Sequence, residues 1–403
     1  MYLHATDRVF PNSQTNAVKG NIYWDARKSI WLFAMIAGGI AAIIFTPNWG
    51  GVMVFFITTA ITICAGHSVG MHRLLIHKSF QTPKWLEYIL VWLGTLVGMA
   101  GPFGIIRAHD MRDWHQRQSI CPPHPSHGAS FWRDAWWQMH CRFDLDNPPH
   151  FEIEPEIAND RLYRWMERHW MAQQLAVAVP LYLLGGIGFV LWGVCLRVAI
   201  SLNGHWIIGH FAHKDGHQGW IVRGLSVQGF NLRGFGLITF GESWHSNHHA
   251  FPHSAKLGIE KGQLDPGFWF IKLLESVGLA DRILGPFDLP ERDGLTRVSA
   301  PVRSYRSRPQ RACSPLGTFP LEIPCRAMVA EFPRDDVAAV VIQDRAEIIP
   351  SPADDSEIKY RFSSVYLAAS SPVDSVSCSS ADSMRSSRRA SGIRFQTDPG
   401  RGE

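Results

Sequence analysis

Paired cysteines are absent from this sequence of 403 residues. Its seven cysteines contain no CxxC pair, and their odd number argues against a disulfide framework or a zinc site built from thiolates. A reducing compartment fits this cysteine usage best. The sequence also lacks, at its start, a basic segment followed by an apolar core, so we expect no cleaved secretory signal.

Charged residues are scarce as well. They make up 18% of the chain, against 46% hydrophobic residues, which is typical of a membrane protein. The net charge is only +4, and the basic residues do not alternate with aromatic residues, which argues against nucleic-acid binding. Composition shifts to Ser, Arg, Pro and Asp near residue 290. We therefore expect an N-terminal cytoplasmic segment (1–28), a membrane domain (29–290) and a disordered low-complexity tail (291–403).

Four apolar segments are candidates for membrane helices, at about 29–46, at about 51–66, and two within 171–206 that are joined by a turn at 183–188. The turns at 46–51 and 183–188 contain no charged residue, whereas basic residues flank the other ends of these segments. The positive-inside tendency then places both termini and the histidines in the cytoplasm. The sequence thus predicts an all-α, multi-pass integral membrane protein with about four transmembrane helices in two hairpins and a helical cytoplasmic cap.

A further apolar run covers residues 86–106 and lies between two groups of histidines. A single crossing there would put those histidines on opposite faces of the membrane. Because "GPFG" at 101–104 would break a straight helix, we expect this run to be buried in the cap or to re-enter, with a fifth span as the alternative.

Histidines are abundant, and several have the spacing of metal ligands. His245, His248 and His249 form HxxHH, which puts three imidazoles on one face of a helix. His67 and His72 form HxxxxH, and an α-helix would separate them by about 140°, which suits two neighbouring ions better than one. The alternative for this pair is two interfacial histidines without a ligand role.

Two more histidine clusters complete the set. In "RAHDMRDWHQRQ", Asp113 lies four residues after His109, and a carboxylate is a competent iron ligand beside imidazole. The charged residues there could equally form a solvated network. After the fourth apolar segment come His205, His210, His213 and His217, of which His213 is best placed to bind and the others to orient ligands or remain ordinary polar residues. So many imidazoles exceed the needs of one tetrahedral ion, which favours two ions.

These residues resemble the integral-membrane fatty-acid desaturases, the acyl-CoA desaturase branch in particular, over about residues 25–285. That family carries three histidine boxes: HxxxxH, HxxHH and again HxxHH. His67 with His72 matches the first box, the histidines from 245 to 249 match the third, and His213 resembles an additional ligand of that branch. The middle box carries over only at His109. Its gap is filled by Asp113, by His115, or more remotely by His124, His127 or His140, unless one metal site is weakened.

The resemblance implies a di-iron centre that activates O2 and inserts a double bond into a long acyl chain linked to coenzyme A or to a lipid. The expected metal ligands are His67, His72, His109, Asp113, His213, His245, His248 and His249. The chain has no "HPGG" haem signature and no cysteine cluster for an iron–sulfur centre, so the electrons should come from an external ferredoxin- or cytochrome-type donor with its reductase.

Three alternatives stay open at this point. A membrane di-iron hydroxylase or alkane monooxygenase would share the scaffold and differ in its product. A histidine-rich membrane metal-binding or transport protein would need polar ligands at the membrane midplane, whereas these histidines gather at one end of the apolar segments. A catalytically silent relative, disabled at "HDMRD", is the third.

Overall fold

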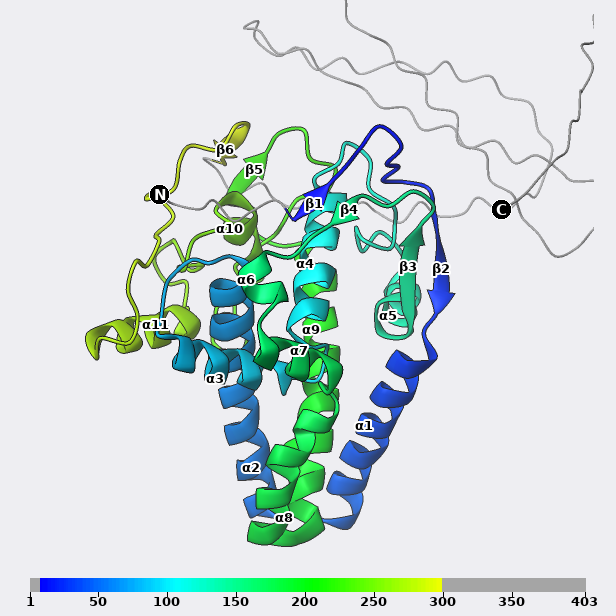
Figure 1. Cartoon of the computed structure of the whole chain (residues 1–403), viewed down its shortest axis with the longest axis vertical. Coiled ribbons are helices and arrows are strands. Elements are labelled where there is room, and N and C mark those ends of the chain that lie inside the picture. The colour runs from blue at the N-terminus through cyan, green and yellow to red at the C-terminus, as the bar shows by residue number, and fades with distance from the viewer. Residues whose placement is uncertain (1–7, 299–403) are drawn as a thin grey trace, which may run out of the picture. The chain divides into compact units, whose positions relative to one another are not determined.

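The structure, a computed structural model, describes residues 8–298. Of the tail expected at 291–403, the structure describes residues 291–298, and the rest lies outside the described residues. Figure 1 shows a stalk of long helices beneath a cap of shorter helices, strands and loops.

Three helical stretches are long and apolar enough to cross a membrane. They are Ala26–Phe45, Trp49–Ile76 and Ala172–Ala212. The first is α1, and the second joins α2 (Trp49–Ala60) to the π-helix η1 (Ile61–Ile76). The third contains η2 (Ala172–Gln174), α8 (Leu175–Val190), η3 (Leu191–Leu196) and α9 (Arg197–Ala212).

The third stretch is interrupted at the turn that the sequence predicts. Gly185 and Gly186 are not helical, and Gly186 has a φ of 65°, which glycine adopts without strain. A Cβ built on Gly193 would lie 2.5 Å from the Leu181 side chain, although a straight helix would hold these residues about 18 Å apart. The chain therefore reverses direction between them and forms a hairpin, as expected for 183–188.

The first two stretches begin with side-chain caps. Asp25 accepts a hydrogen bond from the backbone N–H of Lys28 at the start of α1, and Asn48 accepts one from Gly51 at the start of α2. The second stretch runs ten residues beyond the expected end at residue 66. This extension carries the helix from the apolar stalk into the cap.

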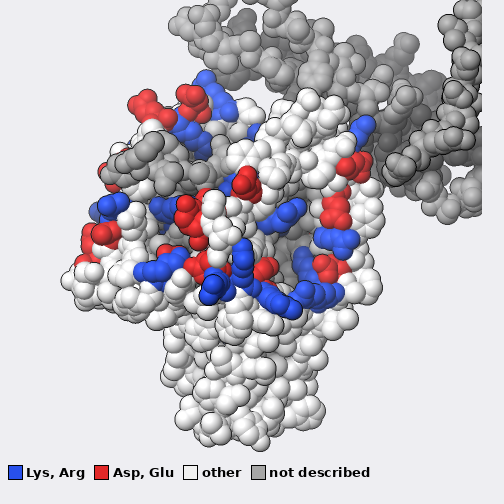
Figure 2. Space-filling view, viewed as in Figure 1, with Lys and Arg blue, Asp and Glu red and all other residues white. Residues whose placement is uncertain are grey.

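Figure 2 supports a membrane setting for the stalk. Its surface in this view has no Lys, Arg, Asp or Glu, whereas charged side chains gather where the stalk meets the cap and above. Arg197 lies within the third stretch but is fully buried, and it donates to the backbone oxygens of Gly193 and Leu96. The chain therefore presents an apolar band to its surroundings.

The cap contains six helices among the described residues besides η1. They are α3 (Lys84–Thr95), α4 (Pro102–Gln116), α5 (Phe131–His140), α6 (Pro155–Ala158), α7 (Arg161–Arg168) and α10 (His245–Ala250), with α11 (Pro266–Ser276) at its edge. A buried core holds η1, α3, α4 and α7 together, including Met71, Val91, Ile106 and Tyr163. This core fixes the positions of the helices that carry the histidines.

The expectation of an all-α fold is too strict, because the structure has three antiparallel strand pairs. These are β1 (Val9–Phe10) with β4 (His150–Phe151), β2 (Gly20–Trp24) with β3 (Cys141–Leu145), and β5 (Trp220–Val222) with β6 (Leu295–Arg297). The first two pairs attach the N-terminal segment to the cap, and β6 lies within the segment expected to be disordered. Such short strands leave too little periodic pattern for sequence analysis to find.

The apolar run 86–106 does not form one long helix. It forms α3, a turn, and the start of α4, which begins at Pro102. Within the described residues it is not one of the helices long enough to span a membrane. The close packing of α3 on η1 needs glycine: a Cβ on Gly70 would lie 2.4 Å from the backbone oxygen of Leu90.

Candidate metal centre

Four histidines from three segments form a first histidine group. They are His72, His77, His109 and His248, whose ligand nitrogens all lie within 4.8 Å of one another. His72 lies on η1, His77 caps that helix, His109 lies on α4 and His248 on α10. The Nε2 atoms of His77 and His109 are 3.2 Å apart. Two nitrogens bound to one ion at about 2.1 Å and at right angles would be about 3.0 Å apart, so this spacing fits a shared ion.

Three further histidines form a second histidine group. They are His213, His245 and His249, also within 4.8 Å. The Nε2 atom of His245 lies 3.0 Å from that of His213 and 3.0 Å from that of His249. His213 ends α9, and the other two lie four residues apart on α10, one above the other.

The expected HxxHH face on α10 is divided between the two groups. His248 belongs to the first, while His245 and His249 belong to the second. The rings of His248 and His249 are 5.9 Å apart and nearly perpendicular. One short helix therefore holds the two groups side by side, which is the arrangement a pair of ions requires.

His67 lies in neither group, and this departs from the expected ligand set. Its ring lies 4.9 Å from that of His205. His77, which sequence analysis missed, joins His72 instead. The segment is π-helical, and the backbone N–H of His77 bonds to the oxygen of His72, five residues back. His67 stands at the same spacing on the other side of His72, so the neighbours decide: the ring of His77 lies 4.8 Å from those of His109 and His248, whereas the ring of His67 meets His205. His72 and His77 repeat the HxxxxH spacing, which was the available signal.

Neighbouring acceptors orient three of these imidazoles. The Nδ1 atom of His72 is 2.7 Å from Glu242, and that of His109 is 2.9 Å from Asp110. His213 donates through Nδ1 to the backbone oxygen of Gly209 at 2.7 Å. Contacts of this kind fix the tautomer of a ligand histidine and direct its Nε2 at the metal. Arg8, which is buried, in turn donates to Asp110 at 2.8 Å and so ties the N-terminal segment to His109.

Asp113 lies in neither group within 4.8 Å, although it lines the same cavity as both. It forms an ion pair with Arg117. Burial raises the pKa of this carboxyl, but Arg117 and nearby imidazoles lower it to about 2. Asp113 is thus a carboxylate at every physiological pH, and imidazoles of both groups, His109, His248 and His249, lie near it.

The other candidates for the middle box remain outside both groups. His115 and His124 pack against Phe143, and His140 lies 3.0 Å from the hydroxyl of Ser29. His217, one of the histidines expected after the fourth apolar segment and not a middle-box candidate, also belongs to no group of ligating side chains among residues 8–298. None of them replaces the missing middle-box histidines.

His127 and His210 surround a buried carboxylate, that of Asp134. The Nδ1 atoms of these histidines lie 2.9 and 2.6 Å from Oδ2 of Asp134, and the indole N–H of Trp206 lies 3.0 Å from the same oxygen. Burial raises the pKa of Asp134, but these hydrogen bonds hold it below the usual range. Because three donors already use this oxygen, we interpret the cluster as a structural anchor rather than a metal site.

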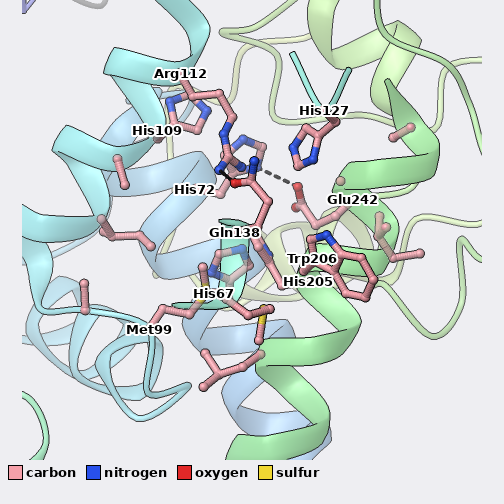
Figure 3. A pocket seen from close by; sticks show the side chains of 18 of the residues that line it. His67, His72, Met99, His109, Arg112, His127, Gln138, His205, Trp206 and Glu242 are labelled. Atoms are coloured by element: carbon pink, nitrogen blue, oxygen red, sulfur yellow. Dashed lines mark hydrogen bonds and ion pairs between the residues drawn. The ribbon is translucent and has the colours of Figure 1, made fainter. Parts of the chain in front are cut away.

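A cavity of about 460 Å³ connects the two groups to the top of the stalk. Ligand histidines of both groups line it, and so do apolar side chains, among them Trp31, Leu32, Met99 and Leu202. Figure 3 shows Arg112, His127 and Gln138 around the same space, with His67, His205 and Met99 toward the stalk. The cavity can therefore hold an alkyl chain beside the two histidine groups.

The donor set fits two metal ions. Seven imidazoles converge without a thiolate, and imidazole with carboxylate suits iron, zinc, copper or nickel. Burial lowers the pKa values of His77, His213, His245 and His248 well below the ordinary range, so these imidazoles are neutral and can bind metal.

Comparisons with known proteins agree with this site. Residues 47–259 match the profile of the family described as "Fatty acid desaturase". The chain is 31% identical to the sn-2 palmitoyl-lipid 9-desaturase of Nostoc sp. (strain 36) over 265 residues, which are 63% of this chain and 90% of that protein. It is 33% identical to the sn-1 stearoyl-lipid 9-desaturase of Anabaena variabilis over 239 residues, 59% of this chain and 85% of the relative. It is 30% identical to an acyl-CoA 5-desaturase of Anemone leveillei over 249 residues, 62% of this chain and 76% of the relative.

Proposed function

The chain belongs to the fatty acid desaturase family, and from this premise we propose that its two histidine groups each hold one iron ion at the wall of an acyl cavity. The protein is a membrane-bound oxidoreductase, a fatty acyl desaturase. The observation that carries the proposal is the convergence of seven imidazoles into two adjacent groups that face one cavity. The revised ligand set is His72, His77, His109 and His248 for one ion, and His213, His245 and His249 for the other.

Asp113 is our proposal for the remaining ligand of the second ion. The second group has three imidazoles where the first has four, and the Asp113 carboxylate lies on the cavity wall near His249. A carboxylate binds iron together with imidazoles in the 2-His-1-carboxylate sites of non-haem iron enzymes. Its present partner, Arg117, would have to share it with the metal.

Bound iron supplies the activation of O2 and, with two electrons from an external donor, the oxidising power that removes two hydrogens from adjacent methylene carbons. The residues of this chain hold and orient the ligands. Glu242 and Asp110 keep His72 and His109 in one tautomer, and burial keeps the imidazoles neutral.

The cavity determines which carbons lie beside the metal groups. Apolar side chains such as Trp31, Leu32 and Met99 enclose an alkyl chain and exclude water from it. Holding the chain in one position brings a single pair of carbons within reach and removes the entropic cost of finding it. The double-bond position therefore depends on how far the alkyl chain reaches past the two histidine groups into the cavity.

We infer a long acyl chain as substrate, carried by a lipid or by coenzyme A, since relatives with both kinds of name match this chain. We also infer an external ferredoxin- or cytochrome-type donor with its reductase. We further propose four membrane crossings in two hairpins, α1 with α2 and α8 with α9, which the apolar stalk supports, and, from the distribution of basic residues in the sequence, a cytoplasmic location for the cap and both termini.

Expression in a host with a defined lipid profile tests the proposal. We expect new acyl species that lack two hydrogens, detected by mass spectrometry, and a matching requirement for iron. New species that instead carry an added oxygen would identify a hydroxylase. No new species from an iron-loaded protein would identify a silent relative.

A further inference from the structure

Several polar side chains line the acyl cavity without belonging to either histidine group. Arg112 and Gln138 lie on one wall, and His67 and His205 lie toward the stalk (Figure 3). An alkyl chain offers no hydrogen bond to any of them, and a buried polar group without a partner is unfavourable. The desaturase reaction as described above assigns these side chains no role.

Arg112 is the most conspicuous of them because it has a charge and almost no partner. Within residues 8–298, no carboxylate forms an ion pair with it, and its one hydrogen bond goes to Oε1 of Gln138 at 2.7 Å. A guanidinium has five N–H donors, so most of those on Arg112, which lines the cavity, have no hydrogen-bond acceptor among residues 8–298. Burial accordingly lowers the pKa of Arg112.

The position of this guanidinium is fixed. Gln138, its partner, donates to the backbone oxygen of His124 at 2.6 Å and to Asp134 at 3.3 Å. Arg112 also lies one helical turn after His109 on α4, on the same face. Any group that Arg112 binds is therefore held close to the first histidine group.

His67 and His205 extend the polar lining on the opposite side. Their rings meet edge to face at 4.9 Å, and neither forms a hydrogen bond within the described residues. They come from η1 and α9, two helices of the stalk. Two imidazoles without partners facing a cavity indicate a ligand with polar atoms.

His127 adds a third kind of evidence. It is 1% exposed, and its Nε2 atom has no partner although it lines the cavity. Its Nδ1 atom donates to Asp134, so Nε2 of the neutral ring can accept a hydrogen bond, for example from a hydroxyl group.

We propose that Arg112, His67 and His205 form a polar subsite in the acyl cavity that binds an oxygen-bearing group of the substrate close to the carbons that are oxidised. The inference rests on the proposed desaturase function and adds a specificity to it. The oxygen belongs either to a hydroxyl on the chain, which would also satisfy His127, or to the carbonyl that joins the chain to its carrier. In both cases the new double bond lies within a few carbons of that oxygen.

The test compares Arg112→Gln with Arg107→Gln in the full-length, iron-loaded protein. Arg107 lies on the same helix, is exposed and does not line this cavity, so it is the matched control. The probes are stearoyl-CoA, β-hydroxystearoyl-CoA and phosphatidylcholine vesicles with stearoyl chains. The measurements are KM, kcat, bound iron and double-bond position.

We expect Arg112→Gln to keep its iron and to raise KM by about ten- to hundred-fold, because a hydrogen bond from a charged donor is lost. The double bond should spread over several positions, and Arg107→Gln should behave as the wild type. If KM rises only with the hydroxylated probe, the group bound by the subsite is a hydroxyl on the chain. If KM rises equally with all probes, the bound group is the carbonyl that joins the chain to its carrier.

His205→Leu provides a second variant that leaves α4 unchanged, and it should also spread the double-bond position. An unchanged KM and a single product from both variants would overturn the inference. So would loss of iron from Arg112→Gln, which would make Arg112 a support of the metal group. Failure of the proposed function would look different: the wild type would bind iron and give no unsaturated product.

Discussion

The two histidine groups face one cavity but are built differently. The first draws four imidazoles from three segments, and carboxylates of Glu242 and Asp110 orient two of them. The second draws three imidazoles from the end of α9 and from α10, and its one orienting contact among the hydrogen bonds described above is a backbone oxygen. The difference teaches that the unusual "HDMRD" segment affects the two sites unequally. It retains His109 for the first and leaves the second short of an imidazole.

The largest effect should come from removing one histidine of each group from α10, the helix that contributes to both. His248→Ala should lose iron from the first group, and His245→Ala should lose iron from the second, because each opens the coordination of one ion. Both should abolish desaturation. Iron per chain and its spectroscopic signature in the two variants report the losses, and identical spectra for both variants would contradict the division of α10 between two ions.

The next prediction tests whether Asp113 is a ligand of the ion in the second group. Asp113→Asn removes the charge with little change in shape, so iron affinity should fall at the second group and stay unchanged at the first. We expect a fall of at least about ten- to hundred-fold, the range found when contacts that orient metal ligands are lost. Stepwise removal of iron by a chelator measures it. Wild-type affinity and full activity would exclude Asp113 as a ligand.

A smaller effect on iron affinity should follow from removing a contact that orients a histidine of the first group. Glu242→Gln keeps a hydrogen-bond acceptor near His72 but removes the charge, so the first group should lose about ten-fold in iron affinity. Glu275→Gln, on the exposed end of α11, is the matched control. If Glu242→Gln weakened the second group instead, the assignment of His72 would be wrong.

The smallest expected effect is on stability, and it comes from buried cap histidines that belong to neither histidine group. Burial lowers the pKa of His115 to about 4 and of His124 to about 3, against 6.5 in the unfolded chain. Below about pH 6.5 the unfolded state therefore binds more protons than the folded state, and the free energy of unfolding falls as pH drops toward 4. The Tm of metal-free protein should be lower at about pH 5 than at about pH 7.5, and His115→Phe should reduce this difference.

Much of the arrangement follows from the sequence. The turn at Gly185 and Gly186, the break before Pro102, and the convergence of His109, His213 and the histidines on α10 are expected from periodicity, spacing and resemblance. Their role as metal ligands stays a prediction. These features depend on local sequence, which an α-helical pattern describes well.

The structure differs from the expected arrangement where the backbone departs from that pattern. The interpretation of His67 and His72 assumed 100° per residue, whereas η1 is π-helical and brings residues five apart nearer to one face. Spacing alone therefore does not choose between His67 and His77 as the partner of His72, and the contacts of His77 with His109 and His248 do. Glu242 and Arg8 were missed because their contacts join segments far apart in the chain. Spacing within a segment carries no information about such contacts.

The pair His77 and His67 tests the central claim most directly, because each stands five residues from His72. Iron should be measured in purified His77→Ala and His67→Ala proteins beside the wild type. Our account predicts that His77→Ala loses the iron of the first group and that His67→Ala retains both ions. Retention of both ions by His77→Ala, with loss from His67→Ala, would contradict it.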